Sequence, residues 1–259
     1  MSERYTRAIL RVPGENFAAG LTSAAAGAPD LLRAQAQHRH YAAALAVCGL
    51  ELATLPADAR YPDGTFVEDT AVLTPDLAIV TRPGAPSRRG ETAAIATELA
   101  SRYATVRTIA PPGTVDGGDV CQAGTRFFIG LSARTNEHGA RQLAGWLAES
   151  GFAATFVDIR STPGLLHLKT GIAYLGDARL AVMAGLAGLA DFDGYETIEV
   201  AAQESYAANC IRVNARVLVA AGHPRFADRL AALGLDPLPL EMSEFRKMDG
   251  GLSCLSLRF

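Results

Sequence analysis

One pattern of predicted secondary structure recurs about five times along the 259 residues of this chain. In each copy an Ala/Leu-rich helical segment leads into a short β-type run, and a hairpin-like pair of strands then precedes the next helix. The copies are spaced by roughly 40–60 residues. Helices are predicted over residues 30–48, 90–102, 136–150, 184–190 and 223–233. A chain with this period builds its core from packed copies of one unit, because no copy can bury its apolar face alone.

The order of the strands predicts how the copies are joined. The runs after the helices are residues 50–55, 106–109, 153–159, 196–200 and 235–240, and the hairpins are residues 66–81, 119–131, 171–183 and 210–220. The last run, 252–259, could be completed by residues 4–12 from the start of the chain. This rotation of strands and helices predicts an α/β fold, a closed five-bladed α/β propeller of pseudo-fivefold ββαβ repeats around a central cavity. No linker or low-complexity tract divides the pattern, so residues 1–259 are predicted to form a single domain.

Composition and charge narrow the class of protein. Hydrophobic residues make up 49% of the chain and charged residues 20%, as is typical of a folded globular protein. The net charge of -3, with acids and bases interspersed, argues against a nucleic-acid partner. The longest apolar run, residues 180–190, is too short to cross a bilayer, so no membrane partner is expected. The scattered cysteines and the absence of an apolar leader favour a cytoplasmic protein.

Residues 248–254, Met-Asp-Gly-Gly-Leu-Ser-Cys, place a thiol just after a paired-glycine turn. Glycines allow a backbone to approach a ligand closely, and the short run that carries Cys254 is predicted to be a strand. A free cysteine is commonly a buried core residue, and for Cys254 alone that interpretation would be favoured. The glycines, the neighbouring carboxylate of Asp249 and a histidine at the matching position of another repeat favour a reactive thiol.

Polar and reactive side chains recur where the inner strand of each predicted repeat begins. They are Asp63, Glu68 and Asp69, then Asp116 and Asp119, then His167, then Asn209, and finally Cys254. In a closed ring these positions converge on the axis. Cys254 and His167 then form a thiol–imidazole pair, in which the thiolate is the nucleophile and the imidazole can protonate a leaving group. Either Asp116 or Asp119 could orient the imidazole.

Three acids, Asp63, Glu68 and Asp69, lie within seven residues around Phe66. The apolar residues of 66–73 predict a buried strand, whose alternation would send Glu68 and Asp69 to opposite faces. A buried carboxylate is costly unless a cation pairs with it. An incoming cationic substrate is one candidate for that cation, and an internal salt bridge from a distant arginine is the other.

Two arginines, Arg88 and Arg134, stand in equivalent loops just ahead of two consecutive predicted helices. A surface arginine that caps the preceding chain is the default interpretation. A guanidinium can also bind a carboxylate with two parallel hydrogen bonds. Because both arginines occupy the same position of the repeat, they are predicted to bind a ligand carboxylate.

Together these residues resemble the dimethylarginine dimethylaminohydrolase family, within the guanidino-group-modifying (pentein) superfamily of five-bladed α/β propellers. The resemblance covers residues 11–257. Its motifs are Phe66-Val67-Glu68-Asp69-Thr70, residues 84–90, Asp116-Gly117-Gly118-Asp119-Val120, residues 130–136, Leu166-His167-Leu168-Lys169-Thr170, Ala207-Ala208-Asn209-Cys210 and residues 249–254. The resemblance implies a central active-site cavity in which Nω-methylated L-arginine, asymmetric dimethylarginine or monomethylarginine, is hydrolysed. The products would be L-citrulline and dimethylamine or methylamine, formed through a covalent thiouronium intermediate on a cysteine.

The resemblance also implies roles for single residues. Cys254 would be the nucleophile, His167 the acid/base and Asp116 the acid that completes the triad, although some bacterial relatives have glutamate there. The implied substrate-binding residues are Leu21 on a mobile lid, Asp63 at the amino end of the substrate, Phe66, Glu68 and Asp69 around the guanidinium, Arg88 and Arg134 at the α-carboxylate, Met248 through its carbonyl, and Asp249. Met248 stands where relatives have another apolar residue.

Two other functions fit parts of this pattern. An arginine deiminase acting on unmethylated arginine has similar site chemistry, but such enzymes usually carry an inserted helical region that is not evident here. A non-catalytic propeller serving as a binding module would be expected to lose the Cys254, His167 and Asp116 set. No cofactor is expected, and no cluster has the ligand spacing of a structural zinc site. The expected partner is therefore a small-molecule substrate, and the sequence is compatible with a homodimer.

Overall fold

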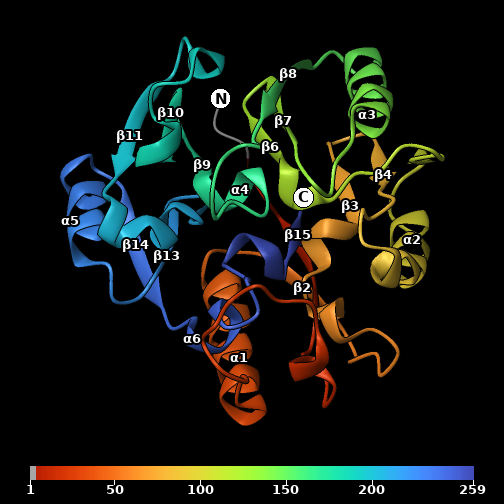
Figure 1. The fold of residues 1–259 in the computed structure, drawn as a ribbon, viewed down its shortest axis with the longest axis horizontal. Coiled ribbons are helices and arrows are strands. Elements are labelled where there is room, and N and C mark those ends of the chain that lie inside the picture. Colours follow the sequence, from red (N-terminus) through yellow and green to blue (C-terminus); the bar gives the residue numbers. More distant parts are fainter. Residues whose placement is uncertain (1–3) are drawn as a thin grey trace.

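Five three-stranded sheets stand around a common axis in the computed structural model, which describes residues 4–259 (Figure 1). Each sheet runs from an inner strand near the axis to an outer strand at the rim. From inner to outer, the sheets are β15 (Leu257–Arg258), β1 (Arg7–Arg11) and β2 (Glu51–Leu55); β3 (Ala71–Leu73), β4 (Ala78–Val80) and β5 (Val106–Thr108); β6 (Val120–Ala123), β7 (Arg126–Leu131) and β8 (Ala153–Asp158); β9 (Ile172–Gly176), β10 (Arg179–Met183) and β11 (Glu196–Val200); β12 (Ile211–Val213), β13 (Arg216–Ala220) and β14 (Asp236–Leu240). The predicted five-bladed α/β propeller is confirmed.

Every sheet is paired in the same way. The inner and middle strands are antiparallel, while the middle and outer strands are parallel. Parallel neighbours need a crossover connection, and helices on the outside of the ring supply it in four repeats. These helices are α1 (Leu31–Val47), α2 (Thr92–Ala100), α3 (Glu137–Glu149) and α5 (Pro224–Ala232). Of two one-turn helices, α4 (Leu168–Gly171) lies near the axis and α6 (Ser243–Arg246) packs beside α1 (Figure 1).

The fourth repeat departs from the prediction. In place of an α-helix over residues 184–190, the chain forms two short 3-10 turns, Ala184–Leu186 and Ala190–Phe192. Gly185 and Gly188 fall within this stretch, and each glycine costs a helix about 1 kcal/mol relative to alanine. The segment is also too short to recover that cost by packing, so the Ala/Leu pattern alone was misleading here.

Side-chain caps begin two of the other helices, and a glycine follows the end of one of them. The carboxylate of Asp30 accepts a hydrogen bond from Arg33 N–H at the start of α1, and the side chain of Asn136 accepts one from Gly139 N–H at the start of α3. Gly151 follows α3 with a φ of 83°, a left-handed conformation that glycine adopts without strain.

The two ends of the chain close the ring. β1 pairs antiparallel with β15, in the register Ala8 to Arg258 and Ile9 to Leu257. Residues from both ends therefore complete one sheet, as the sequence pattern predicted. This closure fixes the segment before β15, including Cys254, at the axis of the propeller.

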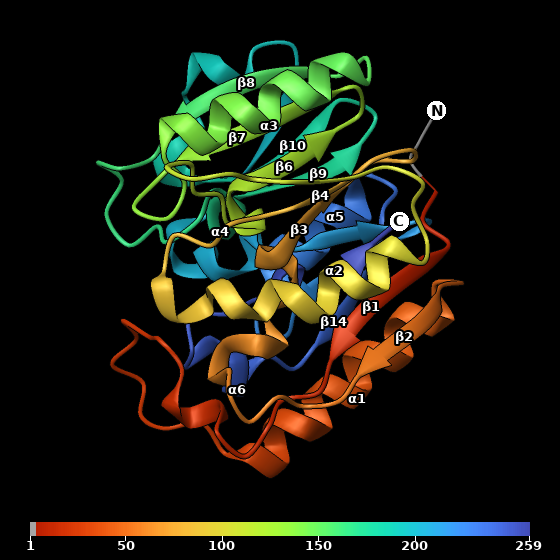
Figure 2. The same cartoon turned by 90° about the vertical axis from the view of Figure 1, so that its right-hand side faces the viewer.

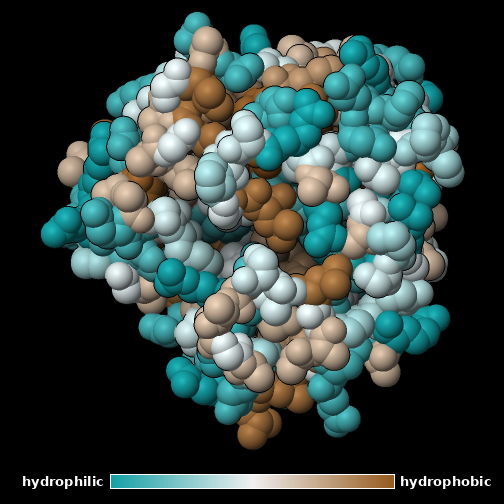
Figure 3. All heavy atoms as spheres, viewed as in Figure 1, coloured by the Kyte–Doolittle hydropathy of each residue, from teal (hydrophilic) through white to brown (hydrophobic). Residues whose placement is uncertain are grey.

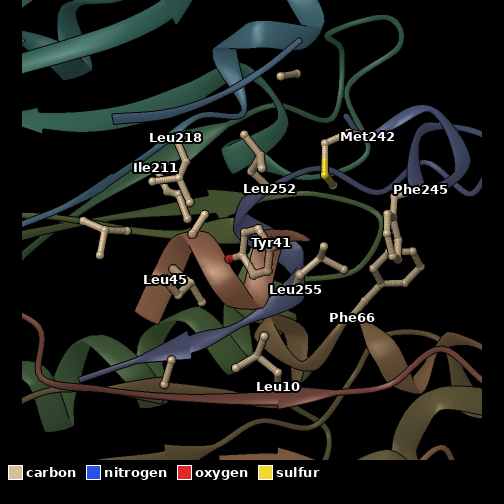
Figure 4. Packing of buried hydrophobic residues seen from close by; sticks show 14 of the residues in the cluster. Leu10, Tyr41, Leu45, Phe66, Ile211, Leu218, Met242, Phe245, Leu252 and Leu255 are labelled. Carbon is tan, nitrogen blue, oxygen red and sulfur yellow. The ribbon is translucent and has the colours of Figure 1, made fainter. Parts of the chain in front are cut away.

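A buried cluster joins the turn before β15 to α1 and α6. Figure 4 shows Tyr41 of α1 among aliphatic side chains. Its hydroxyl lies 2.6 Å from Ser256 Oγ. Phe66 meets Phe245 of α6 edge to face, at a centroid distance of 6.3 Å and an interplanar angle of 74°. The ring of Phe66 is 5% exposed, so this packing anchors the turn that carries the neighbouring acids.

The two faces of the ring differ in what they carry. Figure 2 shows both chain ends on one side, whereas the long loop before α1 lies on the other. Figure 3 looks onto the loop side, where hydrophobic residues gather near the centre of an otherwise mixed surface. Among the helices of residues 4–259, none combines the length and apolarity needed to cross a membrane.

Candidate active site

Side chains from separate repeats line one small pocket on the axis, which we call the central pocket. Its volume is about 30 Å³. It is lined by Leu21, Asp63, Phe66, Asp69, Arg88, Arg134, Leu166, His167, Met248, Asp249, Gly250 and Cys254. All but two of the site residues predicted from the sequence therefore lie at one place. The exceptions are Asp116, which lies behind His167, and Glu68, which faces a different cavity.

His167 precedes α4 and is held from behind by Asp116. The imidazole Nε2 lies 3.0 Å from Asp116 Oδ2, and Asp116 is fully buried. The other carboxylate oxygen of Asp116 accepts a 2.8 Å hydrogen bond from Gly84 N–H, which fixes its orientation. Asp119 is occupied elsewhere, because it accepts hydrogen bonds from Leu168 N–H and Ser132 Oγ. Of the two acids left open by the sequence, Asp116 is the one that orients the imidazole.

The environment of His167 favours its protonated form. Burial alone would lower its pKa, but the charge of Asp69, the hydrogen bond to Asp116 and the charge of Asp119 outweigh it. The pKa of His167 is raised to about 9. At neutral pH the imidazole is therefore protonated.

Cys254 lies in a 3-10 turn, Ser253–Leu255, and not on a strand as predicted. β15 begins only at Leu257, so the thiol is held by the turn itself, with Gly251 N–H 3.4 Å from Sγ. Burial raises the pKa of the Cys254 thiol to about 12, and the charges of Glu68 and Asp69 act in the same direction. The thiol is therefore neutral in the unliganded protein.

The glycines before Cys254 are required by close contacts. A Cβ on Gly250 would lie 2.3 Å from the ring of Phe66, and one on Gly251 would lie 2.5 Å from the side chain of Asn209. Asp249, just before them, has a φ of 56°, a conformation that is uncommon for a residue other than glycine. These residues bring the backbone of the turn against two side chains of the site.

Asp69 is paired inside the protein. Its carboxylate receives a 2.6 Å ion pair from Arg88 Nη1 and a 2.9 Å hydrogen bond from Gly118 N–H. Burial would raise its pKa, but His167 and Arg88 outweigh that effect and lower the pKa of Asp69 to about 2. The carboxylate stays ionised beside the thiol.

The prediction of a strand over residues 66–73 was wrong in its first half. Residues Val67–Thr70 form a 3-10 turn, and the strand β3 covers only Ala71–Leu73. The turn is held by its threonine, whose hydroxyl donates a 2.6 Å hydrogen bond to Val67 O. Glu68 and Asp69 still point to different cavities, but through a tight turn and not through strand alternation.

The two arginines predicted to be equivalent are not equivalent in the structure. Arg88 is 6% exposed and is engaged by Asp69, by Glu91 and by the carbonyl oxygens of Asp63 and Phe66. The Arg134 guanidinium is half-buried, lines the central pocket and forms no ion pair with residues 4–259 as the structure describes them. Arg88 therefore acts first as an internal clamp, whereas Arg134 is open to an anionic group.

A loop closes the central pocket from the solvent side. Leu21 N–H donates to both carboxylate oxygens of Asp63, at 3.0 and 3.2 Å, and Ser23 N–H donates to Asp249 Oδ2 at 2.6 Å. Gly20 allows this approach, because a Cβ there would lie 2.5 Å from Asp63 Oδ1. A pocket of about 30 Å³ holds no more than a few water molecules, so a larger ligand requires the loop to move.

Comparison with known proteins settles the family. The chain is 44% identical over 256 residues to the N(G),N(G)-dimethylarginine dimethylaminohydrolase of Pseudomonas aeruginosa, and the match covers 98% of this chain and 100% of that protein. This chain belongs to the dimethylarginine dimethylaminohydrolase family. The family member of Streptomyces coelicolor is 35% identical over 97% of this chain and 96% of its own length. No protein-family model matches the chain.

Solved structures of the family have the same fold. A mutant of the Pseudomonas aeruginosa enzyme, with serine in place of a cysteine, complexed with citrulline superimposes with a TM-score of 0.96 at 43% identity, covering 99% of this chain and 100% of that one. An adduct of a family member with S-methyl-L-thiocitrulline gives a TM-score of 0.95, covering 98% and 100% of the two chains. A cyanobacterial arginine dihydrolase domain has the same fold at 17% identity and a TM-score of 0.86, covering 97% of each chain.

The sequence did not reveal how Glu68 is neutralised in this family member. Its Oε2 accepts a 2.7 Å hydrogen bond from Ser253 Oγ, beside Cys254. Its Oε1 lies 2.5 Å from Lys169 Nζ and 3.6 Å from Arg258 Nη2, as ion pairs without hydrogen-bond geometry. Glu68 and Asp69 are therefore both paired with cations of the protein itself, which is the internal salt bridge of the two alternatives that the sequence left open.

Asn209 is a site residue to which sequence reasoning gave no role. Its side-chain oxygen accepts from Ser253 N–H at 2.9 Å, and its amide donates to Lys169 O at 3.0 Å and to Ser253 Oγ at 3.2 Å. It thus ties the turn that holds Cys254 to the segment that follows His167. Its place in the Ala-Ala-Asn-Cys motif, at the start of an inner strand, was the available signal.

One group of side chains could hold a metal ion among the residues described. Ligand atoms of Asp69, Asp116 and His167 lie within 4.8 Å of one another. All three already have partners, since His167 contacts Asp116 and Asp69 is paired with Arg88. These internal contacts account for their arrangement.

Proposed function

We propose that this chain hydrolyses Nω-methylated L-arginine, asymmetric dimethylarginine or monomethylarginine, to L-citrulline and dimethylamine or methylamine. The observation that carries the proposal is that Cys254 and His167 line one closed pocket together with the ionised carboxylate of Asp69. Relatives named as dimethylarginine dimethylaminohydrolases, one of them solved with citrulline, support the same activity. We assign it to a single catalytic domain over residues 1–259.

The first step forms a bond between the Cys254 sulfur and the central guanidinium carbon. The free thiol is neutral, because burial and the nearby carboxylates raise its pKa. A bound guanidinium brings a positive charge next to the sulfur, which favours the thiolate, and the thiol proton is released to water. The attack makes the carbon tetrahedral, and the π electrons of the carbon–nitrogen bond move onto a substrate nitrogen.

The second step breaks the bond between that carbon and the methylated nitrogen. His167 is protonated at neutral pH and donates its proton to the departing amine, which leaves an S-alkylthiouronium on Cys254. The neutral imidazole then takes a proton from water as the water attacks the same carbon. The carbon–sulfur bond breaks, citrulline forms and the thiol is restored. Asp116 holds the imidazole in place throughout, through the 3.0 Å contact to Nε2.

The remaining pocket residues fit the parts of such a substrate. Asp69 offers a carboxylate to the guanidinium, and Arg134 offers an unpaired guanidinium to the α-carboxylate. Leu21, Phe66 and Met248 supply apolar surface for the methyl groups and the substrate stem. Holding the reacting groups in line is worth several orders of magnitude in rate.

The test is a citrulline assay with three separate substrates: arginine, monomethylarginine and asymmetric dimethylarginine. Methylated substrates should give citrulline with the matching amine, and Cys254→Ser should bind them without turnover. Citrulline from arginine alone would instead support the deiminase alternative. A fully active Cys254→Ser protein would refute the covalent scheme.

The cytoplasm is the compartment that fits this proposal, because all four cysteines are free and the nucleophile is a thiol. A homodimer is compatible with this proposal, and the apolar side chain of Leu32, 76% exposed on α1, is surface that such an assembly would cover. Light scattering of the purified protein tests the assembly.

A further inference from the structure

The inner strands enclose a second cavity, of about 670 Å³, which we call the axial cavity. It is lined by residues of both chain ends, which lie on the side of the ring away from the closing loop (Figure 2). Only a thin wall separates it from the central pocket. Glu68 and Ser253 line the axial cavity, while their chain neighbours Asp69 and Cys254 line the central pocket.

The wall carries an excess of positive charge. Lys169 and Arg258 both face Glu68, at 2.5 and 3.6 Å, so two cations share one carboxylate. Both cations line the axial cavity, with side chains only 16% and 12% exposed. Glu68 supplies one negative charge against these two positive charges, so a second anion would balance them.

The rest of the lining is cationic as well. Its basic residues are Arg4, Arg7, Arg102, Lys169, Arg212 and Arg258. The carboxylates of the lining are Glu51 and Glu68, and Glu98 and Asp177 reach Arg102 and Arg212 from outside it. The cations therefore exceed the carboxylates even after every ion pair is counted. A concave surface of one sign concentrates ligands of the other sign.

Apolar side chains form the middle of the axial cavity. Each of the five inner strands contributes at least one aliphatic residue to its lining, and one from each strand is Val72, Val120, Ile172, Ile211 and Leu257. We call these residues the collar. A cavity with an apolar wall and a few convergent polar groups is the usual form of a small-molecule site.

We propose that the axial cavity binds a small organic carboxylate with an apolar body. The carboxylate lies at Lys169 and Arg258, and the apolar body lies against the collar. The same two cations hold Glu68, which accepts a hydrogen bond from Ser253 beside Cys254. A bound carboxylate competes with Glu68 for them and is therefore felt at the thiol, a coupling that does not depend on the proposed reaction.

The experiment measures binding of octanoate to the purified full-length chain by calorimetry. Three control ligands are measured in the same way. Acetate has the carboxylate without the apolar chain, octanol has the apolar chain without the carboxylate, and inorganic phosphate is an anion of another kind. Gln122→Glu keeps the shape of the wall and adds a negative charge to the axial cavity, and Arg258→Gln removes the excess cation. Gln203→Glu, on an exposed residue, is the matched control, and Arg134→Gln reports binding in the central pocket instead.

One equivalent of octanoate should bind, at least about tenfold tighter than acetate, octanol or phosphate. Gln122→Glu and Arg258→Gln should each weaken it by about tenfold or more, while Gln203→Glu and Arg134→Gln leave it unchanged. Failure of octanoate to bind, loss of binding in Arg134→Gln, or full binding in Gln122→Glu overturns the site. If Arg258→Gln does not fold, Gln122→Glu decides.

The coupling has its own readout. Saturating octanoate should slow alkylation of Cys254 by iodoacetamide in the wild type, because Glu68 then bears more of its charge toward the thiol. An unchanged rate with octanoate bound overturns the coupling. Neither measurement needs turnover, so failure of the proposed hydrolysis would appear in the citrulline assay alone.

Discussion

The imidazole Nε2 of His167 lies 3.0 Å from Oδ2 of Asp116, whose side chain is fully buried. This contact, together with the charge of Asp69, holds the pKa of His167 at about 9 against the opposing effect of burial. A carboxylate that is fully buried and fixed by Gly84 N–H has one orientation, so the imidazole it contacts has one as well.

Asp116→Asn should lower kcat by about 10²- to 10⁴-fold, because a neutral amide stabilises the imidazolium far less. The pH above which activity declines should also fall from near 9, since the hydrogen bond to Asp116 is one cause of the raised pKa. A pH–rate profile of citrulline formation measures both effects. Asp116→Glu, which keeps the charge, is the control and should retain more activity. If the pH above which activity declines were the same in Asp116→Asn as in the wild type, the His167–Asp116 contact would not be a cause of the raised pKa.

The stability of the protein should depend on pH through the same residue. The pKa of His167 is about 9 in the folded protein and returns to its ordinary value of roughly 6.5 in the unfolded chain. Its contribution is therefore complete below about pH 6.5 and is lost as the pH rises through 9. Urea unfolding across this window should show a falling free energy of unfolding, and His167→Gln should flatten the change. An equally steep decline in His167→Gln would assign it to other groups.

The Cys254 thiol should react slowly with iodoacetamide at neutral pH, because its pKa is raised to about 12. The rate should rise about tenfold for each pH unit, following the thiolate fraction. Glu68→Gln should speed alkylation at a given pH, since it removes a negative charge near the sulfur. Glu241→Gln, on an exposed acid, is the matched control, and Cys254→Ser gives the blank for the other cysteines. Equal rates in Glu68→Gln and Glu241→Gln would contradict the electrostatic cause.

The ring and its axis could be predicted from the sequence because they follow from local signals. A helix start such as Asp30 and a stop such as Gly151 are read within a few residues, and their recurrence sets the period. Placing Cys254 and His167 at equivalent points of the repeat then brought them together without any knowledge of contacts.

The charge pairing of the site could not be predicted, because its partners are distant along the chain. Ser253 is 185 positions from Glu68, to which it donates its hydroxyl hydrogen. The difference between Arg88 and Arg134 has the same origin, since it depends on which loop packs beside Asp69. The turn at Val67–Thr70 reads as a strand by composition, and tertiary hydrogen bonds such as that from Thr81 Oγ1 to Asp69 O override that preference.

The two arginines should respond differently to the same substitution. Arg134→Gln should raise KM by roughly 10- to 100-fold through a lost contact with the substrate carboxylate, with little change in Tm. Arg88→Gln should cost about 3–5 kcal/mol of stability, because it leaves Asp69 and Glu91 buried without their cation. Steady-state kinetics and thermal unfolding of both variants test the contrast. A Tm loss of equal size in the two variants would show that both arginines are structural.

Asn209 should act on kcat more than on KM, because it positions the Cys254 turn without lining the central pocket. Asn209→Ala removes every hydrogen bond of the side chain and should lower kcat by roughly 10- to 100-fold while KM changes by no more than about twofold. Asn209→Asp keeps the acceptor for Ser253 N–H but loses the donor to Lys169 O, so its kcat should be intermediate. Steady-state kinetics of citrulline formation in both variants separate the effect on kcat from the effect on KM. A rise in KM alone would place Asn209 in substrate binding instead.

The loop over the central pocket should open more often when its carboxylate anchors are weakened. Ser23 donates both its N–H and its hydroxyl to Asp249 Oδ2, and Leu21 N–H donates to Asp63. Asp249→Ala should therefore speed hydrogen exchange at the Ser23 amide, while the Leu21 amide, which is anchored by Asp63, changes less. Exchange measured by NMR at each amide separates Ser23 from Leu21. Asp58→Ala, whose carboxylate accepts hydrogen bonds from Arg60 and not from this loop, is the control. Exchange at Ser23 as slow as in the wild type would mean that the loop is held by packing rather than by this carboxylate.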